Sequence, residues 1–401
     1  MSRTTSIGEL AALGALQFGD GYRTKRSEHG QPGYRIIRVA DVVDNAVSFE
    51  GPDFVSADYI RAIGTKLGHP GDILLTTKGT VGRVAVLPEI DEQVVYSPQL
   101  CYFRVVDSEV VNPRFLRYWF SSREFWDQAA DRMNNTDMAA YINLADIRSL
   151  KMTLPSIPSQ QAIAEVLGAL DDKIAANTKL TASAAELAMT QFLKAYENAV
   201  QALPLSELVS TQYGVTTSAH GEPGPKFLRV TDINKKPWIE WETTPNCTIS
   251  DAELSKYRVS AGDILVARMA DPGKAAFINS GDPEAVFASY LVRLQPRNPA
   301  QALYIYYFLR SPRYQEYADG AMSGSVQKNM NAKVIVATDI DLPELDQILL
   351  FNEAVTPLRR LIQSHLDENR KLAATRDALL PQLMSGKLRV KDAEALVAAA
   401  V

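Results

Sequence analysis

The pentapeptide RVADV at residues 38–42 returns as RVTDI at residues 229–233, an offset of 191 residues. Two further blocks repeat at the same offset: GDIL at 71–74 and 262–265, and HGQPG at 29–33, which becomes HGEPG at 220–224. Three separate blocks in one register indicate a tandem duplication of a unit of about 190–200 residues. The duplication sets the fold, because each copy must form its own structural unit.

The first part of each copy consists of short β-like runs separated by Gly, Pro, Asn and Asp, as in a compact α/β domain. The expected strands are 34–39, 72–76, 81–87 and 100–106 in the first copy, and 227–230, 263–267, 275–278 and 290–294 in the second. An aromatic helix is expected to follow at 113–126 and at 299–317. Asn112 and Asn298 would be the N-caps of these helices, with a proline at the first helical position.

The second part of each copy, 158–200 and 345–389, contains little glycine and predicts a long helix. In both segments the inward positions alternate in steps of four and three residues, the period of a coiled-coil seam. The predicted seam includes Leu167, Leu170, Ile174, Asn177, Val355, Leu358, Ile362, His365 and Leu372. We expect the two helices to pair antiparallel, and Pro357 to kink or restart the second one. Two amphipathic helices buried in separate cores are the alternative.

The predicted fold class is therefore α/β, with two similar α/β domains separated by a long antiparallel two-helix coiled coil, related by a pseudo-two-fold internal repeat. The expected boundaries are 1–155 for the first domain, 156–202 for the central helix, 203–342 for the second domain and 343–390 for the C-terminal helix. The Ala-rich tail, 391–401, is expected to be disordered or frayed.

Composition narrows the class of protein. With 46% hydrophobic and 22% charged residues, the 401-residue chain has the profile of a soluble globular protein. A net charge of −5 argues against a protein that coats nucleic acid through a basic surface throughout, but it allows local basic faces. Cys101 and Cys247 lie far apart, and no close His/Cys pair suggests zinc. Without a signal-like start or a long apolar run, we expect a cytoplasmic protein with no membrane association.

Two similar domains on a rigid spacer suit a particular kind of ligand. B-DNA repeats its grooves about every 34–36 Å, so such a body can read two half-sites about one turn apart. Because the copies are similar but not identical, the two half-sites would differ in sequence. This geometry predicts recognition of an asymmetric, two-part DNA target.

The duplicated layout, the RVxDV/I and GDIL blocks, the segment LPSIPSQQAIAEVLGALDDKI (154–174) and the closing LLPQLMSGKLRV (379–390) strongly resemble the specificity subunit of type I restriction–modification systems. The resemblance covers nearly the whole chain. It implies that 1–155 and 203–342 are target-recognition domains, each reading half of a split DNA sequence. It also implies that the helices dock two methyltransferase subunits, and that endonuclease/translocase subunits join the complex. In this family the subunit has no catalytic centre, so S-adenosylmethionine, ATP and Mg²⁺ are expected only in partner subunits.

Candidate DNA contacts are cations and amide or hydroxyl side chains in the loops. The candidates of the first domain are Arg23, Lys25, Arg26, Arg38, Thr77, Lys78, Thr80, Arg83, Asn134 and Asn135. Those of the second domain are Arg229, Lys235, Lys236, Arg268, Lys274, Gln327, Lys328 and Asn329. The basic cluster near residues 23–38 has only Glu28 as a sequence neighbour of opposite charge. A solvated surface is the competing interpretation for any one of these residues, whereas Gly71-Asp72 and Gly262-Asp263 are better read as strand-starting turns.

Two other function classes are alternatives to a DNA-binding specificity subunit. A DNA methyltransferase with its own active site would carry an Asn/Asp-Pro-Pro-Tyr/Phe motif, but Asn112-Pro113-Arg114-Phe115 lacks the second proline and reads as a helix cap. The chain contains no GxxxxGK[ST] phosphate loop. A duplicated protein–protein scaffold is the second alternative. A scaffold would need no basic loops. A DNA reader needs them, and its affinity for DNA would therefore fall steeply as the salt concentration rises.

Overall fold

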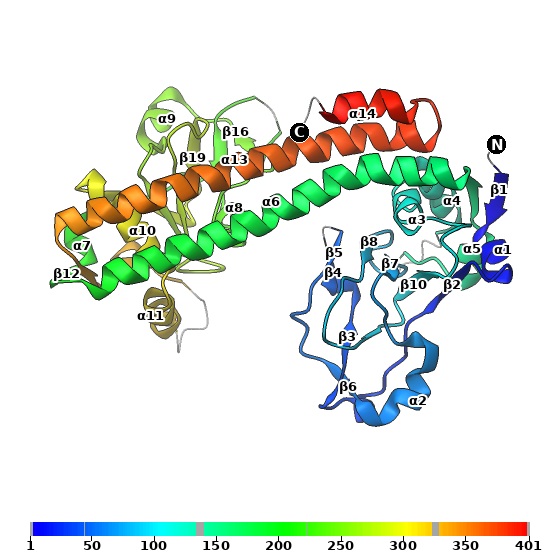
Figure 1. The fold of residues 1–401 in the computed structure, drawn as a ribbon. Helices are drawn as coiled ribbons and strands as arrows, with labels where there is room; N and C mark the ends of the chain where they lie inside the picture. The colour runs from blue at the N-terminus through cyan, green and yellow to red at the C-terminus, as the bar shows by residue number, and fades with distance from the viewer. Residues whose placement is uncertain (1–2, 44, 134–139, 222, 323–328, 399–401) are drawn as a thin grey trace. The chain divides into compact units, whose positions relative to one another are not determined.

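The computed structural model describes residues 3–43, 45–133, 140–221, 223–322 and 329–398. The chain divides into a first unit, Met1–Ala176 with Glu368–Val401, and a second unit, Asn177–Asp367. Two long helices, α6 (Ile157–Glu197) and α13 (Leu345–Met384), each contribute one part to each unit (Figure 1). The mixed α/β class with two long helices is as predicted.

The first unit contains strands and short helices that alternate along the chain. Its strands are β1 (Arg3–Ser6), β2 (Leu16–Asp20), β3 (Gly33–Ile37), β4 (Val42–Val43), β5 (Ala46–Val47), β6 (Phe54–Ser56), β7 (Ile73–Thr76), β8 (Val84–Val86), β9 (Val94–Tyr96), β10 (Leu100–Val105) and β11 (Lys151–Leu154). Its shorter helices are α1 (Ile7–Ala12), α2 (Ile60–Ile63), α3 (Pro113–Trp119), α4 (Arg123–Arg132), α5 (Leu144–Ser149) and α14 (Val390–Ala398).

The second unit repeats this order. Its strands are β12 (Gln201–Pro204), β13 (Val209–Tyr213), β14 (Ala219–His220), β15 (Lys226–Leu228), β16 (Asn246–Cys247), β17 (Ile264–Ala267), β18 (Ala275–Phe277), β19 (Ala285–Phe287), β20 (Leu291–Pro296) and β21 (Asp339–Leu342). Its shorter helices are α7 (Leu205–Leu208), α8 (Val230–Ile233), α9 (Asp251–Tyr257), α10 (Ala302–Arg310), α11 (Pro312–Met322) and α12 (Ala332–Ile335).

The two units share a sheet topology. A four-stranded antiparallel sheet has the order β2-β10-β7-β8 in the first unit and β13-β20-β17-β18 in the second. The registers also agree, since Leu100 lies opposite Thr76 and Leu291 lies opposite Ala267. In both units the strand that precedes the long helix pairs with an early strand, as β11 with β1 and β21 with β12. All eight predicted strands overlap observed ones, so the repeat in sequence is a repeat in topology.

The predicted single aromatic helix after each sheet is wrong, because each copy has a break. In the first unit the Ser122 hydroxyl accepts a hydrogen bond from the Phe125 amide and starts α4. In the second unit the Ser311 hydroxyl accepts from the Tyr314 amide after the end of α10. Breaking the helix lets Trp119, Phe120 and Phe125 meet edge to face in one core, with ring centroids 5.2–5.5 Å apart.

The long helices run antiparallel within each unit, as Figure 1 shows. In the first unit Leu167, Leu170 and Leu372 share a hydrophobic core, and the Asn369 side chain donates to the Ile174 carbonyl at 3.4 Å. In the second unit Phe192 of α6 lies 6.2 Å from Phe351 of α13 between ring centroids. Asn177 is 1% exposed, whereas His365 is half-buried. The seam therefore contains polar side chains near the middle of both helices.

Pro357 does not restart the second helix, because α13 is one helix from Leu345 to Met384. A proline inside a helix costs roughly 3 kcal/mol. Val355 and Ile362, on either side of it, are at most 9% exposed. Burial of this face offsets the lost backbone hydrogen bond.

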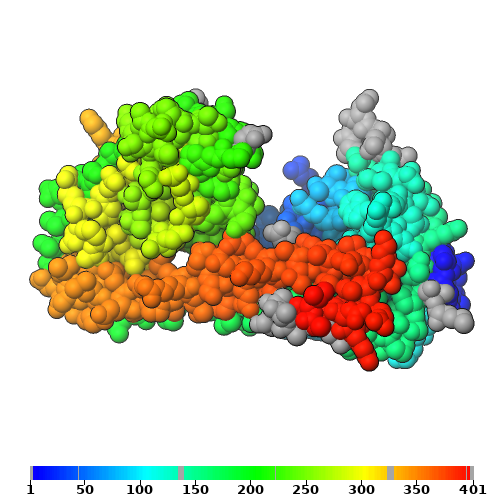
Figure 2. Space-filling model, turned by 90° about the horizontal axis from the view of Figure 1, so that it is seen from above, coloured from blue at the N-terminus to red at the C-terminus, as the bar shows by residue number. Residues whose placement is uncertain are grey.

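The C-terminal tail is helical, so the expectation that 391–401 is disordered or frayed is wrong for the described part. Helix α14 buries Ala393 and Val397 in the core of the first unit, together with Leu379 and Leu383 of α13. The space-filling view places α14, in red, against the end of α13 (Figure 2). Alanine-rich sequence here forms a small apolar helix face that packs closely.

Candidate nucleic-acid interface

The loop between β7 and β8 is held by its own backbone. The Thr76 amide donates to the Arg83 carbonyl and the Gly82 amide donates to the Thr76 carbonyl, both at 2.9 Å. The Thr76 hydroxyl accepts a further bond from the Arg83 amide at 2.9 Å. These bonds close the polar turn 76–83 that the sequence singled out.

The loop between β17 and β18 repeats the same bonds. The Ala267 amide donates to the Lys274 carbonyl and the Gly273 amide donates to the Ala267 carbonyl, both at 2.9 Å. Gly82 and Gly273 occupy equivalent places with φ of 94° and 87°. A Cβ at Gly82 would lie 2.0 Å from the Trp126 ring, so this glycine also permits close approach of the loop to α4.

Each loop is tied to the segment that precedes α5 or α12. The Ile142 amide donates to the Thr77 carbonyl at 3.0 Å, and the Met330 amide donates to the Arg268 carbonyl at 2.8 Å. A β-bridge pairs Met269 with Asn329, as another pairs Lys78 with Tyr141. In the second unit the predicted polar stretch therefore meets the loop through Asn329. In the first unit the contacts are made by Tyr141 and Ile142, which follow the predicted stretch. The candidates Asn134, Asn135, Gln327 and Lys328 lie outside the described residues.

The two loops have the same backbone but different side chains. Thr77 corresponds to Arg268, Lys78 to Met269, and Thr80 to Asp271. Lys78, Thr80 and Arg83 are exposed. A backbone shared by the two loops that presents different donors and acceptors is the arrangement expected of loops that read different sequences.

Two candidates in these loops also support the loop. Thr77 is 9% exposed, and its hydroxyl donates to the Gln99 carbonyl at 2.9 Å. The half-buried Arg268 guanidinium lies 5.0 Å from the ring centroid of Tyr213 and donates to Asn329 Oδ1 at 3.3 Å. Sequence reasoning missed Tyr213 and Tyr141. The signal for Tyr141 was its place six residues after Asn135 of the polar stretch.

The N-terminal basic cluster has more acidic neighbours than the sequence suggested. Arg38 pairs with Asp53 at 2.6 Å, and Arg35 pairs with Glu92 at 2.7 Å. Strand β3 lies between β6 and β9, which brings these carboxylates from distant positions. Glu28 is the only acidic neighbour in sequence, and the fold adds Asp53 and Glu92. The other cations of this cluster, Arg23, Lys25 and Arg26, are exposed.

Among the described candidates of the second unit, Lys235 and Lys236 line one recess with Lys274 of the loop 267–274. Arg229 pairs with Asp232 at 2.9 Å, so its charge is opposed locally. Exposed Lys236 pairs with Glu240 at 2.6 Å. Lys274 Nζ donates to Gln315 Oε1 at 2.9 Å. Exposed Lys235 has no ion pair within the described part of the chain.

The Gly-Asp turns start strands, as predicted. Asp72 is fully buried, and Arg104 donates to both of its carboxylate oxygens at 2.7 Å. The Tyr96 hydroxyl adds a bond at 2.8 Å. Burial, followed by the nearby Asp72 carboxylate, raises the pKa of Tyr96. Asp72 therefore organises the core.

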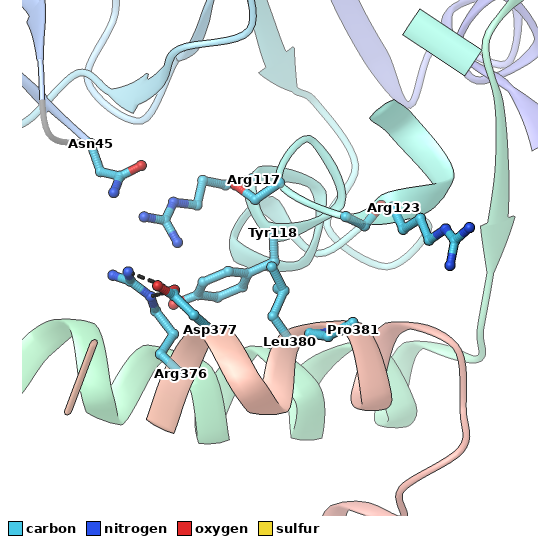
Figure 3. A pocket seen from close by; sticks show the side chains of 10 residues that line it. Asn45, Arg117, Tyr118, Arg123, Arg376, Asp377, Leu380 and Pro381 are labelled. Carbon is cyan, nitrogen blue, oxygen red and sulfur yellow. Dashed lines mark hydrogen bonds and ion pairs between the residues drawn. The ribbon is translucent and has the colours of Figure 1, made fainter. Parts of the chain in front are cut away.

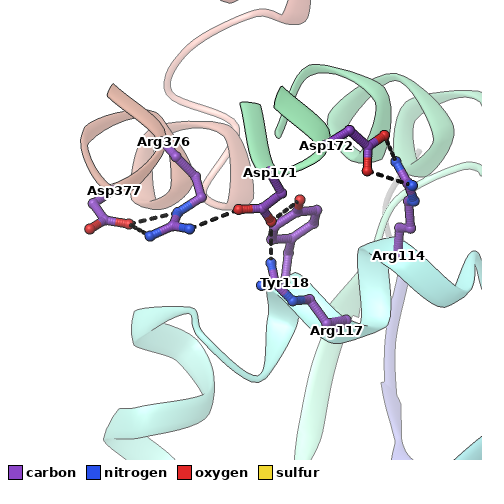
Figure 4. A network of polar contacts seen from close by, with 7 residues as sticks. All are labelled: Arg114, Arg117, Tyr118, Asp171, Asp172, Arg376 and Asp377. Carbon is purple, nitrogen blue, oxygen red and sulfur yellow. Dashed lines mark hydrogen bonds and ion pairs between the residues drawn. The ribbon is translucent and has the colours of Figure 1, made fainter. Parts of the chain in front are cut away.

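A recess of about 390 Å³ in the first unit lies between α3 and α13 (Figure 3). Its charged walls are paired, because Asp171 accepts from Arg117 Nη1 at 2.8 Å, the Tyr118 hydroxyl at 2.6 Å and Arg376 Nη1 at 2.7 Å (Figure 4). Burial opposes ionisation of Asp171, but Arg117, Tyr118 and Arg376 outweigh it and lower its pKa. Next to it, Asp172 accepts two bonds from Arg114 at 2.9 Å. These carboxylates fasten the helix to its own unit.

The described residues hold no group of three or more His, Cys, Asp or Glu side chains placed to bind a metal ion. Asn112 Oδ1 accepts from the Phe115 amide at 3.0 Å, which confirms that this Asn-Pro sequence caps a helix. Asn298 caps the equivalent turn through the Ala300 amide at 3.1 Å. In the part that the structure describes, no helix is long and apolar enough to cross a membrane.

Comparison with known proteins gives a match for the N-terminal part of the chain. Residues 4–185 match the family model of the type I restriction modification DNA specificity domain. This part of the chain is similar to that domain, and the resemblance to type I specificity subunits is confirmed.

Two relatives give the same result. The MjaVIII specificity subunit of Methanocaldococcus jannaschii is 26% identical over 154 residues, which are 37% of this chain. The HindI specificity subunit of Haemophilus influenzae is 25% identical over 171 residues, or 42% of this chain. Each match spans 36% of the relative's length. The crystal structure of a type I S subunit from M. genitalium shares the fold, with a TM-score of 0.58 and 13% identity over 96% of both chains.

Proposed function

We propose that the chain is the non-catalytic specificity subunit of a type I restriction–modification complex. Each recognition domain reads one half of an asymmetric, two-part target in double-stranded DNA. The observation that carries this proposal is the pair of loops 76–83 and 267–274. They share backbone hydrogen bonds and differ at Lys78 against Met269 and at Thr80 against Asp271. Base readout depends on the donors and acceptors that such positions present.

The two long helices are proposed to separate the recognition domains and to dock two methyltransferase subunits. Support comes from apolar side chains that face solvent on these helices. Leu180 and Leu187, one heptad apart on α6, are 51% and 45% exposed, and Leu361 of α13 is 42% exposed. Large exposed apolar side chains flanked by charge are typical of interfaces. Endonuclease/translocase subunits would join this complex, and S-adenosylmethionine, ATP and Mg²⁺ would bind in the partner subunits.

The test is co-expression of the full chain with candidate methyltransferase subunits, followed by genome-wide mapping of methylated adenines. The proposal predicts one interrupted motif with two different halves. A continuous motif, a palindrome or the absence of methylation would contradict it.

A double variant tests whether the loop 76–83 reads bases. Lys78→Met with Thr80→Asp gives the first loop the side chains of the second at these positions. Both residues are exposed, so the fold should persist. We expect one half of the motif to change and the other to stay. The matched control, Lys391→Gln on α14, should leave both halves unchanged. An unaltered motif in the double variant would show that the loops do not read bases.

A further inference from the structure

A basic recess of about 230 Å³ opens in the second unit beside the loop 267–274. Four cationic side chains line it: Lys235, Lys236, Lys274 and Arg310. No carboxylate lines it among the described residues. Two carboxylates contact residues of the lining: Glu240 pairs with Lys236 at 2.6 Å, and Asp271 accepts from Asn234 Nδ2 at 3.4 Å. The recess therefore has a net positive charge.

The wall of the recess is built from fixed groups. Arg310 Nη1 donates to the Tyr306 hydroxyl at 2.8 Å, and its guanidinium lies 5.6 Å from the centroid of that ring. Lys274 Nζ is directed by Gln315 Oε1 at 2.9 Å. Tyr306 is 1% exposed, so Arg310 is anchored in the core. Two of the four cations are thus held in place before any ligand arrives, which lowers the entropy cost of binding.

The first unit has a recess of about 360 Å³ at the equivalent place. Arg83 lines it where Lys274 lines the other, since each residue follows the glycine that closes the reading loop. Asn45 and Ser121 take the places of Lys236 and Arg310, and Arg83 is the only cation among the described residues of this lining. The recess is a repeated feature of the fold, and its charge differs between the two copies.

We propose that the recess formed by Lys235, Lys236, Lys274 and Arg310 binds the phosphodiester backbone of DNA, more strongly than its counterpart at Arg83. This inference rests on the proposed function. Lysine and arginine are suited to phosphate oxygens, and phosphate contacts set the register of a protein on the duplex. Lys274 closes the loop whose side chains would face the bases, because its carbonyl accepts from the Ala267 amide. A phosphate bound here would hold the backbone beside that loop.

The test measures the salt dependence of binding of the full chain to a mixed-sequence DNA duplex. Each lost phosphate contact should reduce the slope of log affinity against log salt by about 0.9, or weaken binding about eightfold at roughly 0.1 M salt. We expect this effect for Lys235→Gln and for Lys274→Gln, and about twice the slope change for the double variant. Arg83→Gln should reduce the slope by at most about one contact. The control Lys391→Gln should leave the slope unchanged.

The outcomes separate this inference from the proposed function. Salt-dependent binding by the wild-type chain, with unchanged slopes in the lysine variants, overturns the recess and leaves the DNA reader intact. Failure of the wild-type chain to bind duplex contradicts both. A second assay adds inorganic phosphate at matched ionic strength and tests whether the recess binds a free anion and not the DNA backbone. If phosphate raised the melting temperature of the wild type only, and DNA binding of the variants were normal, the recess would be a small-anion site and the assignment to DNA would be wrong.

Discussion

Replacement of Asp171 by asparagine tests how the first unit is fastened to its part of the long helix α6. The carboxylate accepts from Arg117 and Tyr118 of α3 and from Arg376 of α13. Its side chain is 23% exposed, and those of Arg117 and Arg376 are 12% and 19% exposed. Asparagine has nearly the same shape but presents one oxygen and an amide group, so at least one arginine faces a donor.

The expected loss follows from this burial. Removing one partner of a buried ion pair costs about 3–5 kcal/mol, and partial exposure of Asp171 reduces this to about 2–3 kcal/mol. For a unit of this size, about 1 kcal/mol shifts the melting temperature by roughly 2–4 °C. Thermal and urea unfolding of the full chain should therefore show a melting temperature about 5–10 °C lower for the first unit. Fluorescence of Trp119 and Trp126 reports on this unit, since the other two tryptophans belong to the second.

Asp172→Asn is the matched control. Asp172 and Arg114 are 62% and 57% exposed, and exposed pairs contribute about 0–1 kcal/mol. A loss at Asp172 as large as that at Asp171, or a loss below about 1 kcal/mol at Asp171, would refute the reasoning.

The difference between wild type and Asp171→Asn should also depend on pH. Its arginine and tyrosine partners hold the pKa of Asp171 below its ordinary value. The pKa of Asp171 is lower in the folded protein than in the unfolded chain, where it is about 3.9, so the ionised carboxylate stabilises the fold above that pH. This stabilisation is lost as the pH falls through the pKa of the folded state. We expect a constant difference above about pH 5 that narrows in more acidic solution.

Two further predictions concern the turns. Gly82→Ala should lower the free energy of unfolding of the first unit, measured in urea, by about 2–4 kcal/mol, because the added methyl group overpacks against the Trp126 ring and alanine is strained at positive φ. Gly79→Ala is the control: there is open space around Gly79, so only the cost of positive φ, about 1–2 kcal/mol, is expected. Asp72→Asn should cost about 3–5 kcal/mol by the same measurement, because it leaves the Arg104 guanidinium without its buried carboxylate. A neutral result at Gly82 or Asp72 would contradict the packing described for that residue.

The repeat and the heptads could be predicted because they are periodic. One offset places the three repeated blocks in both copies, and the 4-3 spacing marks the long helices without knowledge of their partners. The helix break at Ser122 could not be predicted in the same way. Ser122, the second of two adjacent serines in an aromatic run, becomes a cap only when the packing of Phe125 against Trp119 stabilises the bend.

The charge environment was the least predictable part of the site. Asp53 and Glu92 are remote in sequence from Arg38 and Arg35, and they become partners only through the pairing of β3 with its neighbours. The α14 helix was missed for a related reason. Its small apolar face has little meaning until α13 provides the surface on which Ala393 is buried.

Asp271 connects the reading loop to the basic recess. A carboxylate near a DNA backbone is repelled by phosphate, so a loop that places Asp271 where its twin has Thr80 needs compensation. Asn234, which donates to Asp271, lines the recess together with Lys235, Lys236, Lys274 and Arg310, and no carboxylate lines it among the described residues. A carboxylate is also an acceptor that suits the amino group of cytosine in the major groove. If the proposed function holds, the second copy can present the carboxylate of Asp271 to the bases because the cations of its recess attract the DNA backbone. The first copy has the neutral Thr80 at this position and needs no such compensation.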